Sequence, residues 1–133
     1  MDILINLNWL AVLAAAVAGF ATGAIWYGVF AKPWMAAAGL TDADIEQEAS
    51  TYIFAGVLQI VMAITMAIVI AQTGIASWLS GAILGFVIGI GLVTANKALN
   101  AAFQGTSRNL VIIDGLHAAV AFAFMGAILG GWQ

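Results

Sequence analysis

Long runs of apolar residues, separated by short polar stretches, dominate this chain. Four such runs extend over residues 8–30, 52–71, 77–102 and 109–132. A membrane-spanning helix needs about 20 mostly apolar residues at a rise of about 1.5 Å per residue, so each run can cross a bilayer once. The pattern predicts a single all-α domain over residues 1–133, an integral membrane protein whose four transmembrane helices form an antiparallel bundle with short loops.

The composition supports this prediction. Hydrophobic residues make up 65% of the chain and charged residues 7%, whereas soluble domains carry about 25% charged residues. A soluble fold of this size could not bury so much apolar surface. The few charged side chains exclude a nucleic-acid surface, so the expected partner is the lipid bilayer. The chain has no cysteine, which excludes disulfides, thiolate metal sites and cysteine nucleophiles.

Aromatic residues lie near the ends of the apolar runs. Trp and Tyr prefer the interface between lipid and water, and Pro33 within Lys32-Pro33-Trp34 cannot continue a helix, so this stretch is expected to end the first helix. The predicted interface residues are Trp9, Trp26, Tyr27, Trp34, Trp78 and Trp132.

The only sizeable loop, residues 39–50, is acidic. Gly39 is typical of a helix end, and Thr41 resembles a helix N-cap followed by acids in the first turn. Acids at alternate positions could instead bind a divalent cation, but the turn glycine and final glutamate of a calcium loop are absent. A solvated capping segment is the favoured interpretation. Its acids are Asp42, Asp44, Glu46 and Glu48.

The three basic residues indicate an orientation. Lys32, Lys97 and Arg108 all belong to the end of the bundle that carries the first and third loops. Basic residues favour the cytoplasmic side of a membrane. The first and third loops are therefore expected to be cytoplasmic and both termini external.

Glycines recur at four-residue spacing and predict close helix packing. Residues four apart share a helix face, and a face of small residues lets another backbone approach closely in lipid. The spacing leaves open whether these contacts form within one chain or between chains. Four short helices enclose little volume, which favours a homo-oligomer. The packing residues are Gly19, Gly23, Gly81, Gly85, Gly89, Gly126 and Gly130.

Three ionisable residues fall at membrane depth, where each is a candidate functional residue. Lys97 and Asp114 are equally distant from the turn at Gly105-Thr106, so they should lie at the same depth, about 10 Å from the midplane, and form an ion pair. His117 is one turn deeper than Asp114, and Thr94 is its expected neighbour across the hairpin.

These residues allow two interpretations. They could hold a proton, a metal or a polar solute, or they could only lock the helices together by hydrogen bonds. Asn96 and Asn100 continue the polar face toward the loop, as a vestibule or as interhelical hydrogen-bonding groups. The candidate site is Asp114, His117, Lys97, Asn96, Asn100 and Thr94.

No constellation of catalytic residues appears, so nothing indicates an enzyme. One histidine cannot build a metal site alone, although symmetric copies could, and the sequence specifies no cofactor or small-molecule ligand. We consider passage or binding of a small polar solute or proton in a homo-oligomer, an accessory or scaffold subunit of a membrane complex, and a haem or pigment binder through His117.

Several short motifs, in a characteristic order, span nearly the whole chain. They are Asn8-Trp9-Leu10-Ala11-Val12, Trp26-Tyr27, Lys32 to Met35, His117, Phe122, Met125-Gly126 and Gly130 to Trp132. The chain thereby resembles the bacterial membrane family called domain of unknown function 1761. It departs from that family at Gly28-Val29, where Ser-Pro is typical, and at Leu116, where Tyr is common. The resemblance implies a four-helix protein of the bacterial inner (cytoplasmic) membrane without an assigned activity.

Overall fold

A computed structural model describes residues 2–45 and 48–133, and within these ranges every regular element is a helix. The elements are α1 (Asp2–Ile5), α2 (Trp9–Val29), α3 (Ala31–Ala38), the 3₁₀ turn η1 (Asp42–Asp44), α4 (Ala49–Thr73), α5 (Trp78–Ile88), the π-helical η2 (Gly89–Thr94), α6 (Ala95–Gln104) and α7 (Arg108–Gly131). Helices α5, η2 and α6 form one continuous rod. This rod and the helices α2, α4 and α7 are each long and apolar enough to cross a membrane, which confirms the predicted all-α membrane fold.

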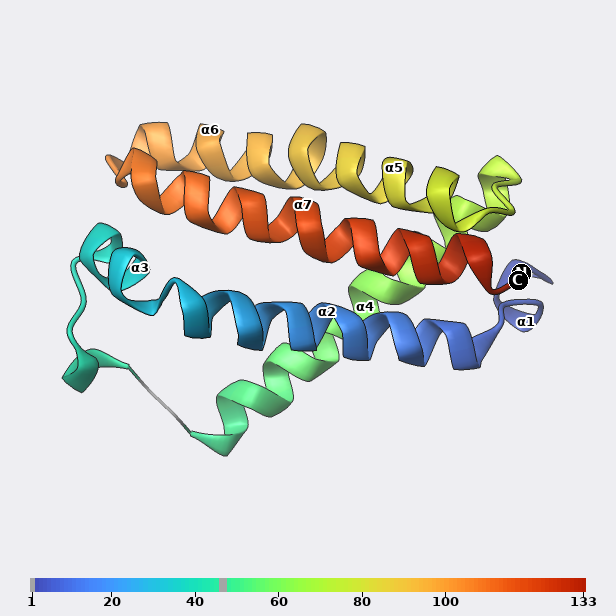
Figure 1. Ribbon diagram of the computed structural model, residues 1–133, viewed down its shortest axis with the longest axis horizontal. Helices are drawn as coiled ribbons and strands as arrows, with labels where there is room; N and C mark the ends of the chain where they lie inside the picture. The colour runs from blue at the N-terminus through green and yellow to red at the C-terminus, as the bar shows by residue number, and fades with distance from the viewer. Residues whose placement is uncertain (1, 46–47) are drawn as a thin grey trace.

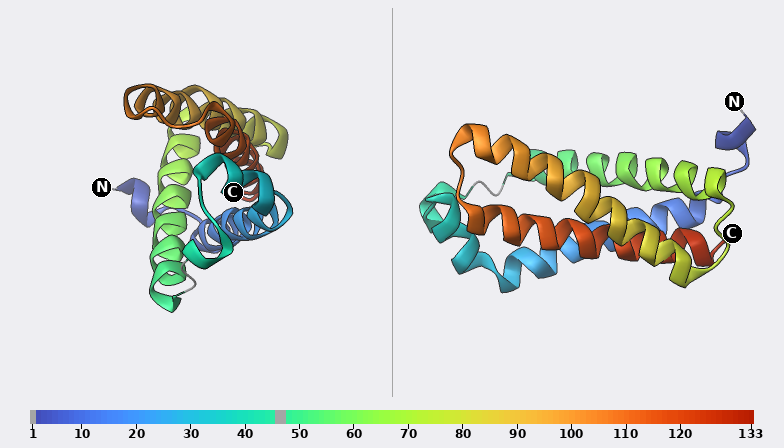
Figure 2. Two further views of the ribbon diagram at one scale, coloured as in Figure 1. Left: turned by 90° about the vertical axis from the view of Figure 1, so that its left-hand side faces the viewer. Right: turned by 90° about the horizontal axis from the view of Figure 1, so that it is seen from above.

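The four long segments run back and forth along the molecule (Figure 1). Helix α2 leads away from the end that holds both termini, α4 crosses behind it on the way back, the α5–η2–α6 rod leads away again, and α7 returns (Figures 1 and 2). We call the end with the termini the terminal end. The opposite end, which carries α3 and the turn between α6 and α7, is the α3 end.

Local chemistry sets the ends of the long helices. Side chains of Asn8 and Ser77 accept hydrogen bonds from backbone N–H groups in the first turns of α2 and α5, which satisfies donors that a helix start leaves free. Gly39, Gly74 and Gly105 adopt left-handed φ angles of 70°, 67° and 68° where α3, α4 and α6 end. Glycine takes this conformation without steric strain, so each helix stops abruptly and the turns are short.

The expectation that Lys32-Pro33-Trp34 ends the first helix is wrong in its detail. Helix α2 already ends at Val29, and the stretch lies in the first turns of α3. Proline is tolerated there because the first N–H groups of a helix have no partner within it. The break at Phe30 and the new helix bring the indole N–H of Trp34 within hydrogen-bond distance of Asp114 on α7.

The acidic loop contains the capping interaction that its sequence suggests. The backbone N–H and the hydroxyl of Thr41 both donate to the carboxylate of Asp44, at 2.8 and 2.7 Å. Both bonds hold the pKa of Asp44 below its usual value, and the bond from the hydroxyl has the larger effect. They do so because they favour the charged form of the carboxylate. The neighbouring Glu46 lies outside the described residues.

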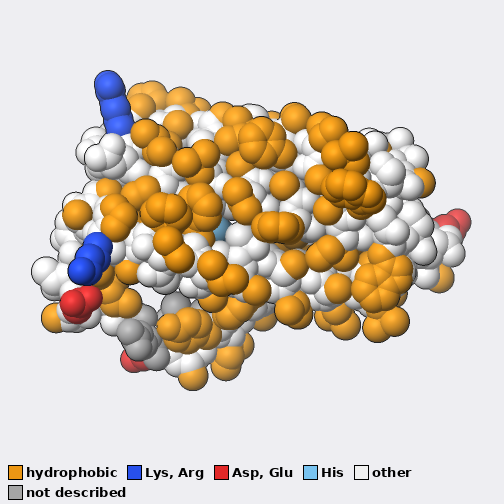
Figure 3. Space-filling model, in the orientation of Figure 1, with side chains coloured by type: hydrophobic (Ala, Val, Ile, Leu, Met, Phe, Trp, Pro, Cys, Tyr) orange, Lys and Arg blue, Asp and Glu red, His pale blue; other side chains and the backbone are white. Residues whose placement is uncertain are grey.

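The hydrophobic core lies in the half of the molecule near the terminal end. Ala15 of α2, Ala63 and Met66 of α4 and Met125 of α7 are each at most 1% exposed. Most of the remaining large apolar side chains point outward and cover the lateral surface, while basic groups gather at the α3 end (Figure 3). An apolar lateral surface of this extent is suited to lipid.

Glycines join the α5–η2–α6 rod to α7 within one chain. A Cβ atom added at Gly85 would collide with the carbonyl oxygen of Phe122, and one at Gly81 with that of Gly126. The two backbones are therefore in direct contact, and these positions accept no side chain. The same surfaces are not available to a second chain.

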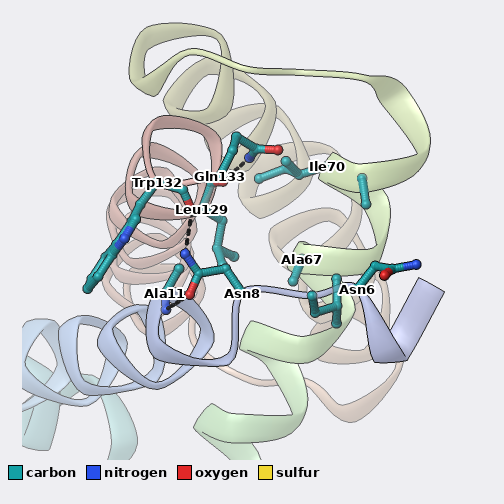
Figure 4. A pocket seen from close by; sticks show the side chains of 10 residues that line it. Asn6, Asn8, Ala11, Ala67, Ile70, Leu129, Trp132 and Gln133 are labelled. Atoms are coloured by element: carbon teal, nitrogen blue, oxygen red, sulfur yellow. Dashed lines mark hydrogen bonds between the residues drawn. The ribbon is translucent and has the colours of Figure 1, made fainter. Parts of the chain in front are cut away.

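The terminal end holds a small hollow of about 100 Å³, lined by the segment 6–8 before α2, by α2 and α4, and by the end of α7 with the residues after it (Figure 4). Asn8, which caps α2, also donates its side-chain amide to the carbonyl oxygen of Trp132 at 3.4 Å. This bond ties the start of α2 to the end of α7. The terminal end is thus held together by capping groups.

Candidate functional site

A polar cluster near the α3 end is centred on the carboxylate of Asp114. The hydroxyl of Tyr27 donates to its Oδ1 atom at 2.7 Å, and the indole N–H of Trp34 donates to the same oxygen at 3.1 Å. The Lys97 ammonium forms an ion pair with Oδ2. The ion pair expected from the equal distance of Lys97 and Asp114 from the turn is therefore present.

The two charges of this pair differ in exposure. The side chain of Asp114 is 12% exposed, whereas that of Lys97 is 42% exposed. The carboxylate is held in place by donors from α2 and α3, while the ammonium reaches it on a flexible stem from α6. The acid is thus the fixed member of the pair and the lysine the movable one.

Three of the six predicted interface aromatics form polar contacts around this cluster. Besides Tyr27 and Trp34, Trp26 donates its indole N–H to the carbonyl oxygen of Ile113 at 3.1 Å. Sequence reasoning missed these bonds because it could not give the rotation of α2 or the path of the chain after Val29. The other three aromatics remain exposed toward the terminal end: Trp9, Trp78 and Trp132.

His117 lies one turn deeper than Asp114 on α7. Its ring centroid is 5.0 Å from that of Tyr27 and 6.3 Å from that of Trp26. A Cβ added at Gly23, on the same helix as this aromatic pair, would lie 3.4 Å from Nε2 of His117. The imidazole therefore packs against α2, with the aromatic pair on the side toward Asp114.

The expected contact between Thr94 and His117 is not formed. The hydroxyl of Thr94 donates to the carbonyl oxygens of Gly89 and Gly115, at 2.7 and 3.1 Å. The close backbone contact between the rod and α7 places Thr94 over Gly115, where no side chain intervenes. Thr94 thus joins two helices instead of completing the polar cluster.

Asn96 and Asn100 are not brought into the cluster either. Both are exposed on α6, and neither side chain forms a hydrogen bond in the part of the chain that the structure describes. Lys97 of the same helix does reach Asp114, whereas the side chains of both asparagines stay exposed. Their amides remain free to meet a partner from outside the bundle.

The cluster offers one carboxylate, one ammonium and neutral donors. Such a set can bind a proton or a small polar solute. Within residues 2–45 and 48–133, no group of three or more His, Asp or Glu side chains is placed to hold a metal ion. The candidate site therefore consists of Asp114, Lys97, Tyr27 and Trp34, with His117 behind them.

A comparison with protein families adds the identity of the family. The sequence profile of the family described as "protein of unknown function (DUF1761)" matches residues 10–130. The chain belongs to this family. The match includes every residue of the cluster, from Tyr27 to His117, and it confirms the resemblance seen in the short motifs. No curated protein and no solved structure matches this DUF1761 chain.

Proposed function

We propose that this protein binds a small polar solute or a proton at Asp114 and passes it across the membrane. The observation that carries the proposal is the ion pair between a fixed, mostly buried carboxylate and a movable, partly exposed ammonium. Ionisable groups at membrane depth are costly to keep, and they mark solute and proton pathways in membrane proteins.

The two carboxylate oxygens of Asp114 have different hydrogen-bond partners. Tyr27 and Trp34 donate to Oδ1, and among the described residues Oδ2 has the ammonium of Lys97 as its one hydrogen-bond partner. A proton or a cationic group that reaches Oδ2 can replace Lys97, whose stem lets the ammonium swing aside. Loss of the proton or solute lets the ion pair form again, so the buried carboxylate is neutralised or paired in both states.

The direction of access follows from the position of the cluster. Asp114 lies about 8 Å from the midpoint of α7 on the side of Arg108, at a rise of 1.5 Å per residue. Lys32, Lys97 and Arg108 belong to elements at this α3 end, so the positive-inside rule supports access from the cytoplasm, with both termini external.

A homo-oligomer is part of this proposal. The half near the terminal end is filled by the apolar core, so one chain offers polar groups in one half of the membrane only. Asn96 and Asn100 are exposed on α6. Amide groups both donate and accept hydrogen bonds, so the same face of a second copy matches them.

The test is proton transfer in reconstituted vesicles with an internal pH-sensitive dye. We expect Asp114→Asn to reduce transfer to the rate of protein-free vesicles, because the amide cannot bind a proton at Oδ2. Asp42→Asn, which changes an exposed carboxylate outside the bundle, should leave transfer unchanged. Native mass spectra should show the same multiple of 13.7 kDa for all three proteins. Normal assembly with unchanged transfer of protons and of small cations in Asp114→Asn would contradict the proposal.

A second candidate function is that of an accessory or scaffold subunit. It is supported by the donors that reach Asp114 from α2, α3 and α6, since such a network ties four elements together. This function predicts that Asp114→Asn dissociates or unfolds the protein and that wild-type vesicles show no transfer above background.

A further inference from the structure

Two buried polar atoms near the middle of the bundle have no hydrogen-bond partner among the described residues. They are Oε1 of Gln59 on α4 and Nε2 of His117 on α7. Polar groups at this depth normally find partners within the protein, because lipid offers none. Two unpartnered polar atoms from different helices therefore indicate a ligand that hydrogen-bonds to both of them.

Both atoms meet α2 at a glycine. A Cβ at Gly23 would lie 3.4 Å from Nε2 of His117, and a Cβ at Gly19 would collide with Oε1 of Gln59. The missing side chains let an imidazole from one neighbour and an amide from the other approach the same face of α2. The two polar groups thus pack against the backbone of α2 at Gly19 and Gly23.

The two unpartnered atoms lie beside α2 positions that are one helical turn apart. Gly19 and Gly23 are separated by about 6 Å along the axis at 1.5 Å per residue. One water molecule can bond two such groups at about 2.8 Å each. It can donate to Oε1 of Gln59 and either donate to or accept from Nε2 of His117.

The depth of His117 and Gln59 in the membrane relates them to the cluster around Asp114, which we call the outer site. His117 and Gln59 lie about 4 Å and 3 Å from the midpoints of α7 and α4, both on the side of the α3 end. Asp114 is one turn further out on the same helix as His117. Beyond the pair, Ala15 and Ala63 are fully buried in the apolar core, so the polar groups end at mid-membrane.

We propose that Gln59 and His117, against Gly19 and Gly23, form an inner site for one water molecule that extends the Asp114 site to the middle of the membrane. The role in proton passage rests on the proposed function, whereas the binding of water does not. A hydronium at this position gives its proton to Nε2 of His117; one O–H bond breaks, one N–H bond forms and a water remains. His117 is then the innermost proton acceptor of the α3 half.

Two glycine substitutions on α2 provide a matched test. Gly23→Ala places a methyl group in ordinary van der Waals contact with Nε2 of His117, while Gly28→Ala meets no atom within 4 Å. Both changes favour a helix, so both variants should fold. We expect Gly23→Ala to abolish proton transfer in vesicles and Gly28→Ala to retain it.

A second readout detects the water itself. His117 is the only histidine, so ¹⁵N-histidine labelling reports this ring alone in NMR spectra. We expect a cross-peak between the imidazole and a slowly exchanging water in the wild type and in Gly28→Ala, and its loss in Gly23→Ala. Gln59→Met, which removes the acceptor at similar length, should also lose it. Thr65→Val removes an exposed hydroxyl of α4 that bonds its own backbone, and it should keep the cross-peak.

The outcomes separate the two proposals. Absence of the cross-peak in the wild type, or its survival in Gly23→Ala, overturns the inner site. Normal transfer in Gly23→Ala together with its loss in Asp114→Asn overturns the role of the inner site in passage and leaves the outer site standing. The cross-peak pattern expected above, with no transfer even in the wild type, supports the inner water site and contradicts the proposed function.

Discussion

At the scale of single residues, the carboxylate of Asp114 organises the α3 half of the molecule. It accepts hydrogen bonds from Tyr27 and Trp34 and pairs with Lys97. In a medium of low polarity each of these donors would otherwise be left without a partner, so the acid and its donors stabilise one another. This network explains why α3, a helix of only eight residues, is held against α7.

Removal of one donor should measure the strength of this network. We expect Tyr27→Phe to lower the free energy of unfolding by about 1–2 kcal/mol, because a hydrogen bond to a charged group is lost. Tyr52→Phe is the matched control, since Tyr52 is the other tyrosine of the chain and is 53% exposed. Unfolding in mild detergent, followed by tryptophan fluorescence, measures both variants. Equal losses in the two would contradict the assignment.

At the scale of elements, contact between the α5–η2–α6 rod and α7 determines which residues meet. The two backbones touch at Gly81 and Gly85, so the rod can take only one rotation and one height against α7. The π-helical turns of η2 follow directly, and there the hydroxyl of Thr94 bonds to the carbonyl oxygen of Gly89. The contact sets Lys97 opposite Asp114.

A side chain at this contact should separate the two helices. We expect Gly85→Ala to destabilise the protein by about 1–3 kcal/mol, the usual effect of overpacking, because its Cβ would collide with the backbone of α7. Gly91→Ala lies in the same rod and meets no atom within 4 Å; its stability should be unchanged or higher. Thermal unfolding in detergent distinguishes them, and a neutral Gly85→Ala would contradict the close contact.

At the scale of the whole molecule, the two halves differ in chemistry. The half near the terminal end is an apolar core of alanines, methionines and larger aliphatic and aromatic side chains, and the α3 half contains the cluster around Asp114. Such a division gives a membrane protein one side from which polar groups can be reached. Orientation therefore decides from which compartment a solute would enter.

Orientation can be tested directly because the chain lacks cysteine. We expect Gln133→Cys, at the terminal end, to react with a membrane-impermeant maleimide in right-side-out vesicles. Asp42→Cys, in the loop at the α3 end, should react only in inside-out vesicles or after lysis. The opposite pattern would reverse the proposed orientation, and labelling of both from one side would contradict the path of the chain across the membrane.

The sequence by itself determined the four long apolar helices, their approximate bounds and the ion pair of Lys97 with Asp114. These properties depend on local quantities. An apolar run of sufficient length forms a spanning helix, glycine ends it, and two positions equally far from a turn lie at one depth. The motifs of the family were likewise readable along the chain, since the family match extends over residues 10–130.

Only the tertiary structure decided which side chains face one another. Trp34 and Tyr27 donate hydrogen bonds to Asp114, which the sequence did not predict, and the hydroxyl of Thr94 bonds to the carbonyl oxygen of Gly115 instead of to His117. The rotation of each helix about its own axis depends on close contacts with all of its neighbours. In helices that are apolar on nearly every face, the hydrophobic pattern carries too little information to specify that rotation.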